Sequence, residues 1–106
     1  MFHIFGFYKF CSIKKLNTLK NYFQRSFINS NIRGTLILSE EGLNGTLSGS
    51  QQNLIKVKKN IKYILKIKKF DSELFSKSKF QPFQKAKVKI KEEVVPIGFK
   101  VLHSDK

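Results

Sequence analysis

Four lysines near the end of the chain have the type and spacing to bind a polyanion. They occupy every second position, and apolar residues separate them: Lys85, Ala86, Lys87, Val88, Lys89, Ile90 and Lys91. Residues two apart in a strand share one face at roughly 6.6 to 6.8 Å, a spacing suited to contacts along a phosphate backbone. Lysines are also typical of edge strands that must not pair with other chains. This lysine ladder therefore predicts either a polyanion-binding face or a solubility device.

The charge of the whole chain favours polyanions as partners without choosing among them. Twenty-one Lys and Arg against seven Asp and Glu give 106 residues a formal charge of +14. Such a surface attracts RNA or DNA first, then an anionic membrane or an acidic protein, in a salt-sensitive manner. Arg33 joins the ladder as a candidate phosphate contact.

Few other side chains could take part in catalysis or metal binding. The pairs Glu40–Glu41 and Glu92–Glu93 could serve as acid and base, but neighbouring carboxylates on strands or turns usually point apart. A single cysteine, Cys11, excludes an internal disulfide and is expected to be an inert thiol in a strand. His3 and His103 lie at opposite ends of the sequence. We therefore predict no metal site, no cofactor and no catalytic residue.

Hydrophobic periodicity indicates the elements that position these residues. Residues 2–13 carry apolar side chains on both alternating faces, which predicts a central strand. The apolar positions then take helical spacing in residues 14–31 and again in residues 51–69, where Ser50 is the expected N-cap. Strands are expected at residues 32–39, 46–49 and 85–95, and residues 70–83 are expected to form a short strand or a loop.

A tight turn is predicted between the second and third strands. Gly42 and the pair Asn44–Gly45 lie in the connection of residues 40–45, and Asn-Gly readily adopts the positive backbone angles of a hairpin turn. This hairpin leaves Glu41 at its tip, an acid in a strongly basic chain.

The order strand, helix, strand, strand, helix, strand predicts an α+β fold, the ferredoxin-like split βαβ sandwich. Two helices then cover one face of an antiparallel sheet. We expect one domain over residues 1–98 and a tail or linker over residues 99–106. The apolar start lacks the charged region and cleavage site of a signal peptide, and nothing is long enough to span a membrane, so we expect a cytoplasmic protein without membrane binding.

Several short motifs carry a family resemblance over residues 8–98. They are Tyr8-Lys9-Phe10, Arg33-Gly34-Thr35-Leu36, Glu41-Gly42-Leu43-Asn44-Gly45-Thr46, Gly49-Ser50, Pro82-Phe83 and the segment from Lys87 to Val95. In order and spacing the chain resembles the amino-terminal domain of the rhodanese-containing tRNA uridine hydroxylases. Within the hairpin, the motif residues are Glu41, Gly42, Asn44, Gly45 and Thr46.

This resemblance implies an acylphosphatase-like domain placed before a rhodanese domain in enzymes that hydroxylate the wobble uridine of tRNA. The family's catalytic cysteine belongs to a Cys-x-x-Gly-x-Arg loop in the rhodanese part. That loop is absent from this sequence, and Cys11 is not its counterpart. The resemblance therefore carries no catalytic residue over to this chain, which is either an excised domain or a short gene product.

Three hypotheses about function follow. The first is an accessory tRNA-binding domain of a hydroxylase, with the hairpin facing a partner domain or the anticodon loop. The second is a protein-interaction module whose hairpin docks a separate rhodanese protein, with the lysines serving only solubility. The expected partners are thus tRNA and a rhodanese domain, in cis or in trans. The third is a small acylphosphatase-like hydrolase, which the sequence disfavours because Ser12–Lys15 stands where acylphosphatases have a glycine-rich phosphate loop with an arginine.

Overall fold

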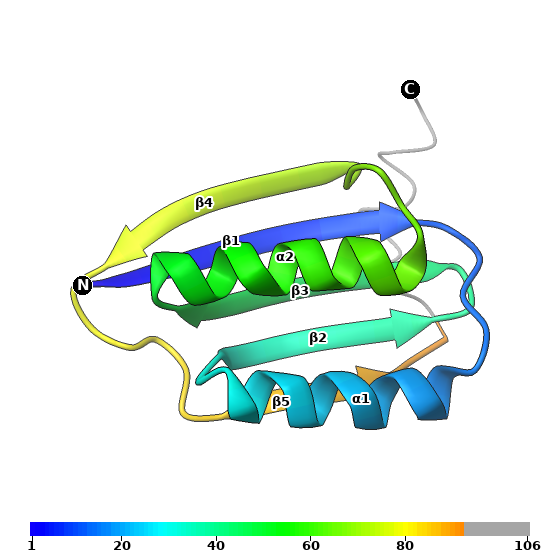
Figure 1. Cartoon of the computed structure of the whole chain (residues 1–106), viewed down its shortest axis with the longest axis horizontal. Helices are drawn as coiled ribbons and strands as arrows, with labels where there is room; N and C mark the ends of the chain where they lie inside the picture. The colour runs from blue at the N-terminus through cyan, green and yellow to red at the C-terminus, as the bar shows by residue number, and fades with distance from the viewer. Residues whose placement is uncertain (93–106) are drawn as a thin grey trace.

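The computed structural model describes residues 1–92, which form a five-stranded sheet covered on one face by two helices (Figure 1). The strands are β1 (Phe2–Phe10), β2 (Arg33–Ser39), β3 (Gly42–Gly49), β4 (Ser72–Ser78) and β5 (Ala86–Ile90), and the helices are α1 (Leu16–Asn29) and α2 (Gln51–Leu65). The strand order is β4-β1-β3-β2-β5. The predicted α+β, ferredoxin-like architecture is confirmed.

The sheet contains one strand more than the predicted order. The segment that begins at Ser72 forms β4, antiparallel to β1, and so supplies the fourth strand of the ferredoxin-like sheet. The lysine strand is a fifth, which pairs in parallel with β2 at the opposite edge and makes the sheet mixed. Its predicted end at Val95 and the predicted tail of residues 99–106 lie outside the described residues.

The core lies between the sheet and the helices. Strand β1 lies in the interior of the sheet, between β4 and β3, as expected for a strand with apolar side chains on both faces, and its Phe5 and Phe7 are buried in this layer. Helix α1 contributes Phe23 and Phe27, both fully buried. Every other element except β4 also contributes buried apolar residues, and the connections add Ile13, Ile32 and Phe70. The apolar stripes expected on the two helices therefore face the core. Neither helix of residues 1–92 has the length and hydrophobicity of a membrane span.

Helix α2 begins as predicted and ends earlier than predicted. The Ser50 hydroxyl accepts a hydrogen bond from the backbone N–H of Asn53 at 3.1 Å, which is N-cap geometry. Lys66 adopts a left-handed conformation (φ 56°) at the C-terminus, so the chain leaves the helix at Leu65 rather than at Lys69.

The predicted position of the hairpin turn is wrong. Ser39 pairs with Gly42, so the turn consists of Glu40 and Glu41 alone, and Asn44–Gly45 lies inside β3. The glycines serve close packing instead. A Cβ on Gly42 would stand 2.1 Å from the carbonyl oxygen of Lys9, and a Cβ on Gly45 would stand 2.5 Å from Cζ of Phe7. Both positions exclude a side chain because of their neighbours in β1.

Candidate nucleic-acid interface

The lysine ladder lies on an edge strand, with the alternation that the sequence predicts. Val88 is buried under α1, whereas Lys87 and Lys89 are exposed. Because successive strand residues face opposite ways, these two lysines lie on the sheet face away from the helices. They stand beside Thr35 and Ile37 of β2 in the parallel register.

A glutamine from α1 holds this strand in place. The Gln24 side chain donates to the carbonyl oxygen of Ala86 at 2.8 Å and accepts from the N–H of Val88 at 2.9 Å. These two backbone groups point away from β2, because the pairing with β2 uses the odd-numbered residues, as in the bond from Gly34 N–H to Lys85 carbonyl at 3.0 Å. We call these two hydrogen bonds of the Gln24 side chain the Gln24 clamp. They hold the backbone of β5 and so orient the side chains of its lysines. Sequence reasoning missed it, although Gln24 borders the apolar stripe beside Phe23.

Arg33 joins the exposed lysines on the same sheet face. It lies two residues before Thr35 in β2, and it is exposed. Lys85 directly precedes β5, and its carbonyl accepts a hydrogen bond at 3.0 Å from the N–H of Gly34, the residue after Arg33. We call the exposed cations Arg33, Lys85, Lys87 and Lys89 the basic edge.

Lys91 lies in a less basic environment than the other lysines of the ladder. Its N–H donates to the Leu38 carbonyl at 2.9 Å, so the backbone continues the ladder. Its side chain, however, shares a shallow pocket of about 400 Å³ with Glu40 and Glu92. Carboxylates at this end of the sheet lower the local positive potential. We therefore expect the positive potential of the basic edge to be highest near Arg33.

The motif residues of the hairpin do not gather into a catalytic group. Thr46 is exposed and Asn44 partly buried on the face away from the helices, whereas Gly42 and Gly45 are buried against β1. Glu41 lies in the turn, where its carbonyl accepts from the Cys11 N–H at 3.1 Å. The hairpin therefore anchors the segment that follows β1, and only Thr46 and Asn44 share a face with the basic edge.

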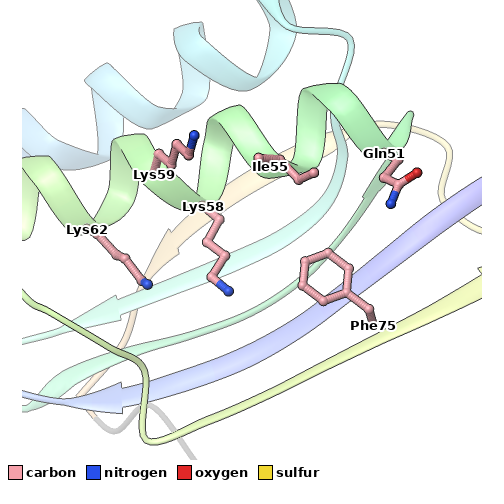
Figure 2. Close-up of a pocket in the computed structure, with 6 residues that line it drawn as sticks. All are labelled: Gln51, Ile55, Lys58, Lys59, Lys62 and Phe75. Atoms are coloured by element: carbon pink, nitrogen blue, oxygen red, sulfur yellow. The ribbon is translucent and has the colours of Figure 1, made fainter.

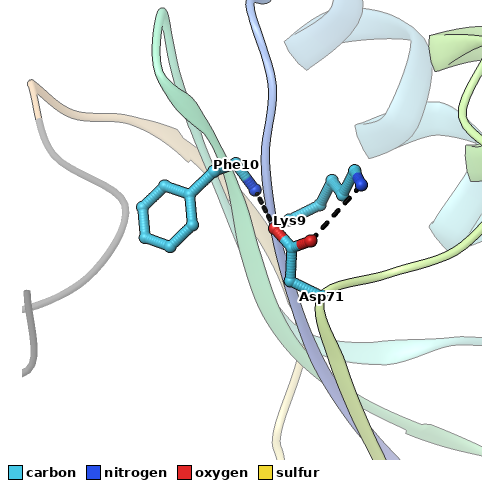
Figure 3. A network of polar contacts seen from close by, with 3 residues as sticks. All are labelled: Lys9, Phe10 and Asp71. Carbon is cyan, nitrogen blue, oxygen red and sulfur yellow. Dashed lines mark hydrogen bonds and ion pairs between the residues drawn. The ribbon is translucent and has the colours of Figure 1, made fainter. Parts of the chain in front are cut away.

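A carboxylate between β1 and β4 forms a separate polar network. Asp71 accepts from the Phe10 N–H at 2.7 Å and from the Lys9 ammonium at 3.3 Å (Figure 3). This network neutralises Lys9 and ties the start of β4 to the end of β1. Its role is structural, and Lys9 is not available to the basic edge.

The surroundings of Cys11 favour the protonated thiol over the thiolate. Partial burial raises the pKa of the Cys11 thiol above its ordinary value, and the nearby Lys9 ammonium only partly opposes this. Among residues 1–92, moreover, no three His, Cys, Asp or Glu side chains come together in a way that could hold a metal ion.

We expect Cys11 to alkylate more slowly in the folded chain than in urea. A raised folded-state pKa favours the thiol, so the stability that this group contributes is complete below the unfolded pKa and is lost as pH rises through the folded value. The rate of iodoacetamide labelling against pH should have its midpoint above that of the unfolded chain, with Cys11→Ser as the blank. A lower midpoint in the folded chain would contradict this assignment.

Comparison with known proteins places the chain among relatives about three times as long. It is 52% identical over 106 residues to a tRNA uridine(34) hydroxylase of Pelagibacter ubique, covering all of this chain and 35% of that protein. A Wolbachia protein of the same name is 32% identical over 97 residues, which are 92% of this chain and 36% of that protein. The chain thus spans about a third of the length of the curated relatives it matches.

Solved structures share the fold. Acylphosphatase from Bacillus subtilis superposes with a TM-score of 0.55 at 10% identity, over 85% of this chain and 98% of that one. The sequence profile described as UPF0176 acylphosphatase like domain matches residues 2–94, which is most of the chain. Profile, relatives and fold agree with the resemblance carried by the sequence motifs, and the chain belongs to the UPF0176 amino-terminal, acylphosphatase-like domain family.

Proposed function

We propose that this domain binds tRNA on behalf of a tRNA wobble-uridine hydroxylase whose catalytic cysteine lies in a rhodanese part outside these residues. The relatives are named tRNA uridine(34) hydroxylases and extend well beyond the matched third.

One observation carries the proposal. The parallel pairing of β2 with β5 sets Arg33, Lys87 and Lys89 on one exposed face, although Arg33 and Lys87 are far apart in the sequence. Cations spaced along a strand can follow successive phosphates. Thr46 adds a hydroxyl on the same face, in β3 opposite Thr35 of β2. The Gln24 side chain holds the backbone of β5, the strand that carries Lys87 and Lys89.

A salt series with matched variants tests tRNA binding. We expect Arg33→Gln/Lys87→Gln/Lys89→Gln to reduce the slope of log affinity against log salt by about 2 to 3, because each lost phosphate contact removes about 0.7 to 0.9 from it. The readout is fluorescence anisotropy with an unmodified tRNA transcript. The control Lys20→Gln/Lys56→Gln/Lys59→Gln removes the same charge from exposed helix positions and should change the slope by less than about 1.

Two outcomes would contradict this proposal. One is negligible affinity of the parent chain for tRNA even at low salt. The other is an equal loss in both triple variants, which would mean that the +14 charge attracts RNA with no defined interface.

A further inference from the structure

Strand β4 is an edge strand without the protection that the opposite edge has. Of the described strands it pairs only with β1, and it borders the top of the sheet in Figure 1. Six of its seven residues are exposed, and it contains neither proline nor glycine. At the other edge, the Gln24 clamp occupies outward-pointing backbone groups of β5. Unpaired edges of this kind are templates for strand addition.

The sequence of β4 is complementary to itself in antiparallel orientation. It reads Ser72-Glu73-Leu74-Phe75-Ser76-Lys77-Ser78, with Phe75 at its centre. If two copies pair about Phe75, Glu73 of each lies opposite Lys77 of the other, Leu74 opposite Ser76 and Ser72 opposite Ser78. Opposite charges across an antiparallel pair stabilise it, and a two-fold axis forms each such contact twice.

The side of β4 that faces the helices also leaves room for a second copy. Glu73, Phe75 and Lys77 share that side, and Phe75 is 42% exposed although its ring stacks on Phe5 at 4.5 Å. A groove of about 370 Å³ separates it from α2, with Ile55 on its apolar part and lysines around it (Figure 2). Lys58 reaches over the Phe75 ring, 5.6 Å from its centroid, and forms an ion pair with Glu73. Helix α2 thus borders Phe75 without covering it.

We propose that β4 pairs antiparallel with β4 of a second copy of this chain, with the two-fold axis at Phe75. The two five-stranded sheets then join into one of ten strands, roughly 4.8 Å apart at the new edge. The two Phe75 rings meet between the α2 helices and bury apolar surface that each copy alone exposes. Lys77 of the second copy gives Glu73 a partner in addition to Lys58.

Charge sets the strength of this dimer. Each copy carries +14, so the copies repel one another at long range, and added salt screens this repulsion. The dimer therefore strengthens as salt rises, whereas tRNA binding weakens. Opposite salt dependence makes the failure of one proposal distinguishable from the failure of the other.

Charge reversal and charge exchange test the pairing. Sedimentation equilibrium of the chain from about 1 µM to 1 mM should show a monomer–dimer equilibrium that tightens with salt. We expect Glu73→Lys and Lys77→Glu each to weaken it by about tenfold or more, because two pairs per dimer become repulsive. The double variant Glu73→Lys/Lys77→Glu restores opposite charges between the copies; made in a Lys58→Gln background, which removes the neighbour of Glu73 within the chain, it should recover the dimer constant of that background within about threefold. Circular dichroism verifies folding, and Lys56→Glu, exposed on α2, is the control.

Cross-linking provides a second measurement that does not depend on charge. A residue on a two-fold axis meets itself, so Phe75→Cys in a Cys11→Ser background should form a disulfide-linked dimer under mild oxidation, whereas Lys20→Cys in the same background should not. A chain that is monomeric at every concentration and salt, or a double variant as weak as the single reversals, would overturn the proposal.

Discussion

Replacing Gly42 by alanine is expected to lower the free energy of unfolding by about 3 kcal/mol or more, from backbone strain and a clash together. Gly42 has φ +151°, a region that L-residues rarely adopt, and its Cβ would lie 2.1 Å from the Lys9 carbonyl oxygen and 3.1 Å from Phe10 Cα. Neither neighbour is a flexible side chain, so β1 and β3 must separate at their junction. In a domain of this size, the melting temperature should fall by roughly 12 °C or more.

Gly6 provides the matched control for Gly42. It also lies in the central part of the sheet, yet a Cβ there would meet no atom within 4 Å. Gly6→Ala should therefore change stability by less than about 1 kcal/mol. Equal losses in the two variants, measured by urea unfolding monitored by circular dichroism, would mean that β1 and β3 do not approach as closely as described.

Truncation of Phe5 to alanine is expected to cost about 3 to 5 kcal/mol, which is the usual range for a fully buried phenylalanine. Phe5 is completely buried, stacks on Phe7 at 4.6 Å and on Phe75 at 4.5 Å, and meets the edge of Phe70 at 5.7 Å. Its loss removes the centre of this aromatic cluster. The midpoint of urea unfolding should shift strongly while its slope stays constant.

Phe75→Ala removes an equally large ring from the same cluster and serves as the comparison. Because Phe75 is 42% exposed, its truncation should cost only about 0.6 times as much as that of the fully buried Phe5, at protein concentrations low enough for the monomer. If Phe75→Ala were the more destabilising variant, the Phe75 ring would have to be more deeply buried in the monomer than described.

Burial explains which elements can be predicted from sequence and which cannot. β1 carries Phe5 and Phe7 toward the helices, and α1 carries Phe23 and Phe27 toward the sheet, so both show a clear apolar period. β4 contributes no residue to the buried core and lacks that signal, which left residues 70–83 without a definite prediction. The lysine strand then took the place of the fourth strand in the predicted order.

The predicted position of the hairpin turn is wrong because the Asn-Gly pair has another role in β3. Asn44–Gly45 is a strong hairpin signal in isolation, but Gly45 is required where the Phe7 ring presses against β3. A sequence shows the absence of a side chain without showing whether a turn or a neighbouring ring demands it. The alternation of Lys87 and Lys89 with Val88 was predicted correctly from local pattern. Their proximity to Arg33 was not, because it depends on a pairing between distant segments.

The Gln24 clamp has a consequence for how many copies can assemble. It engages the outward backbone groups of Ala86 and Val88, so strand addition to this sheet is open at β4 and obstructed at β5. A chain with both edges open could add copies without limit and grow into a fibre. If the proposed β4 pairing forms, growth through the sheet should therefore stop at two copies, because the Gln24 side chain occupies the other edge.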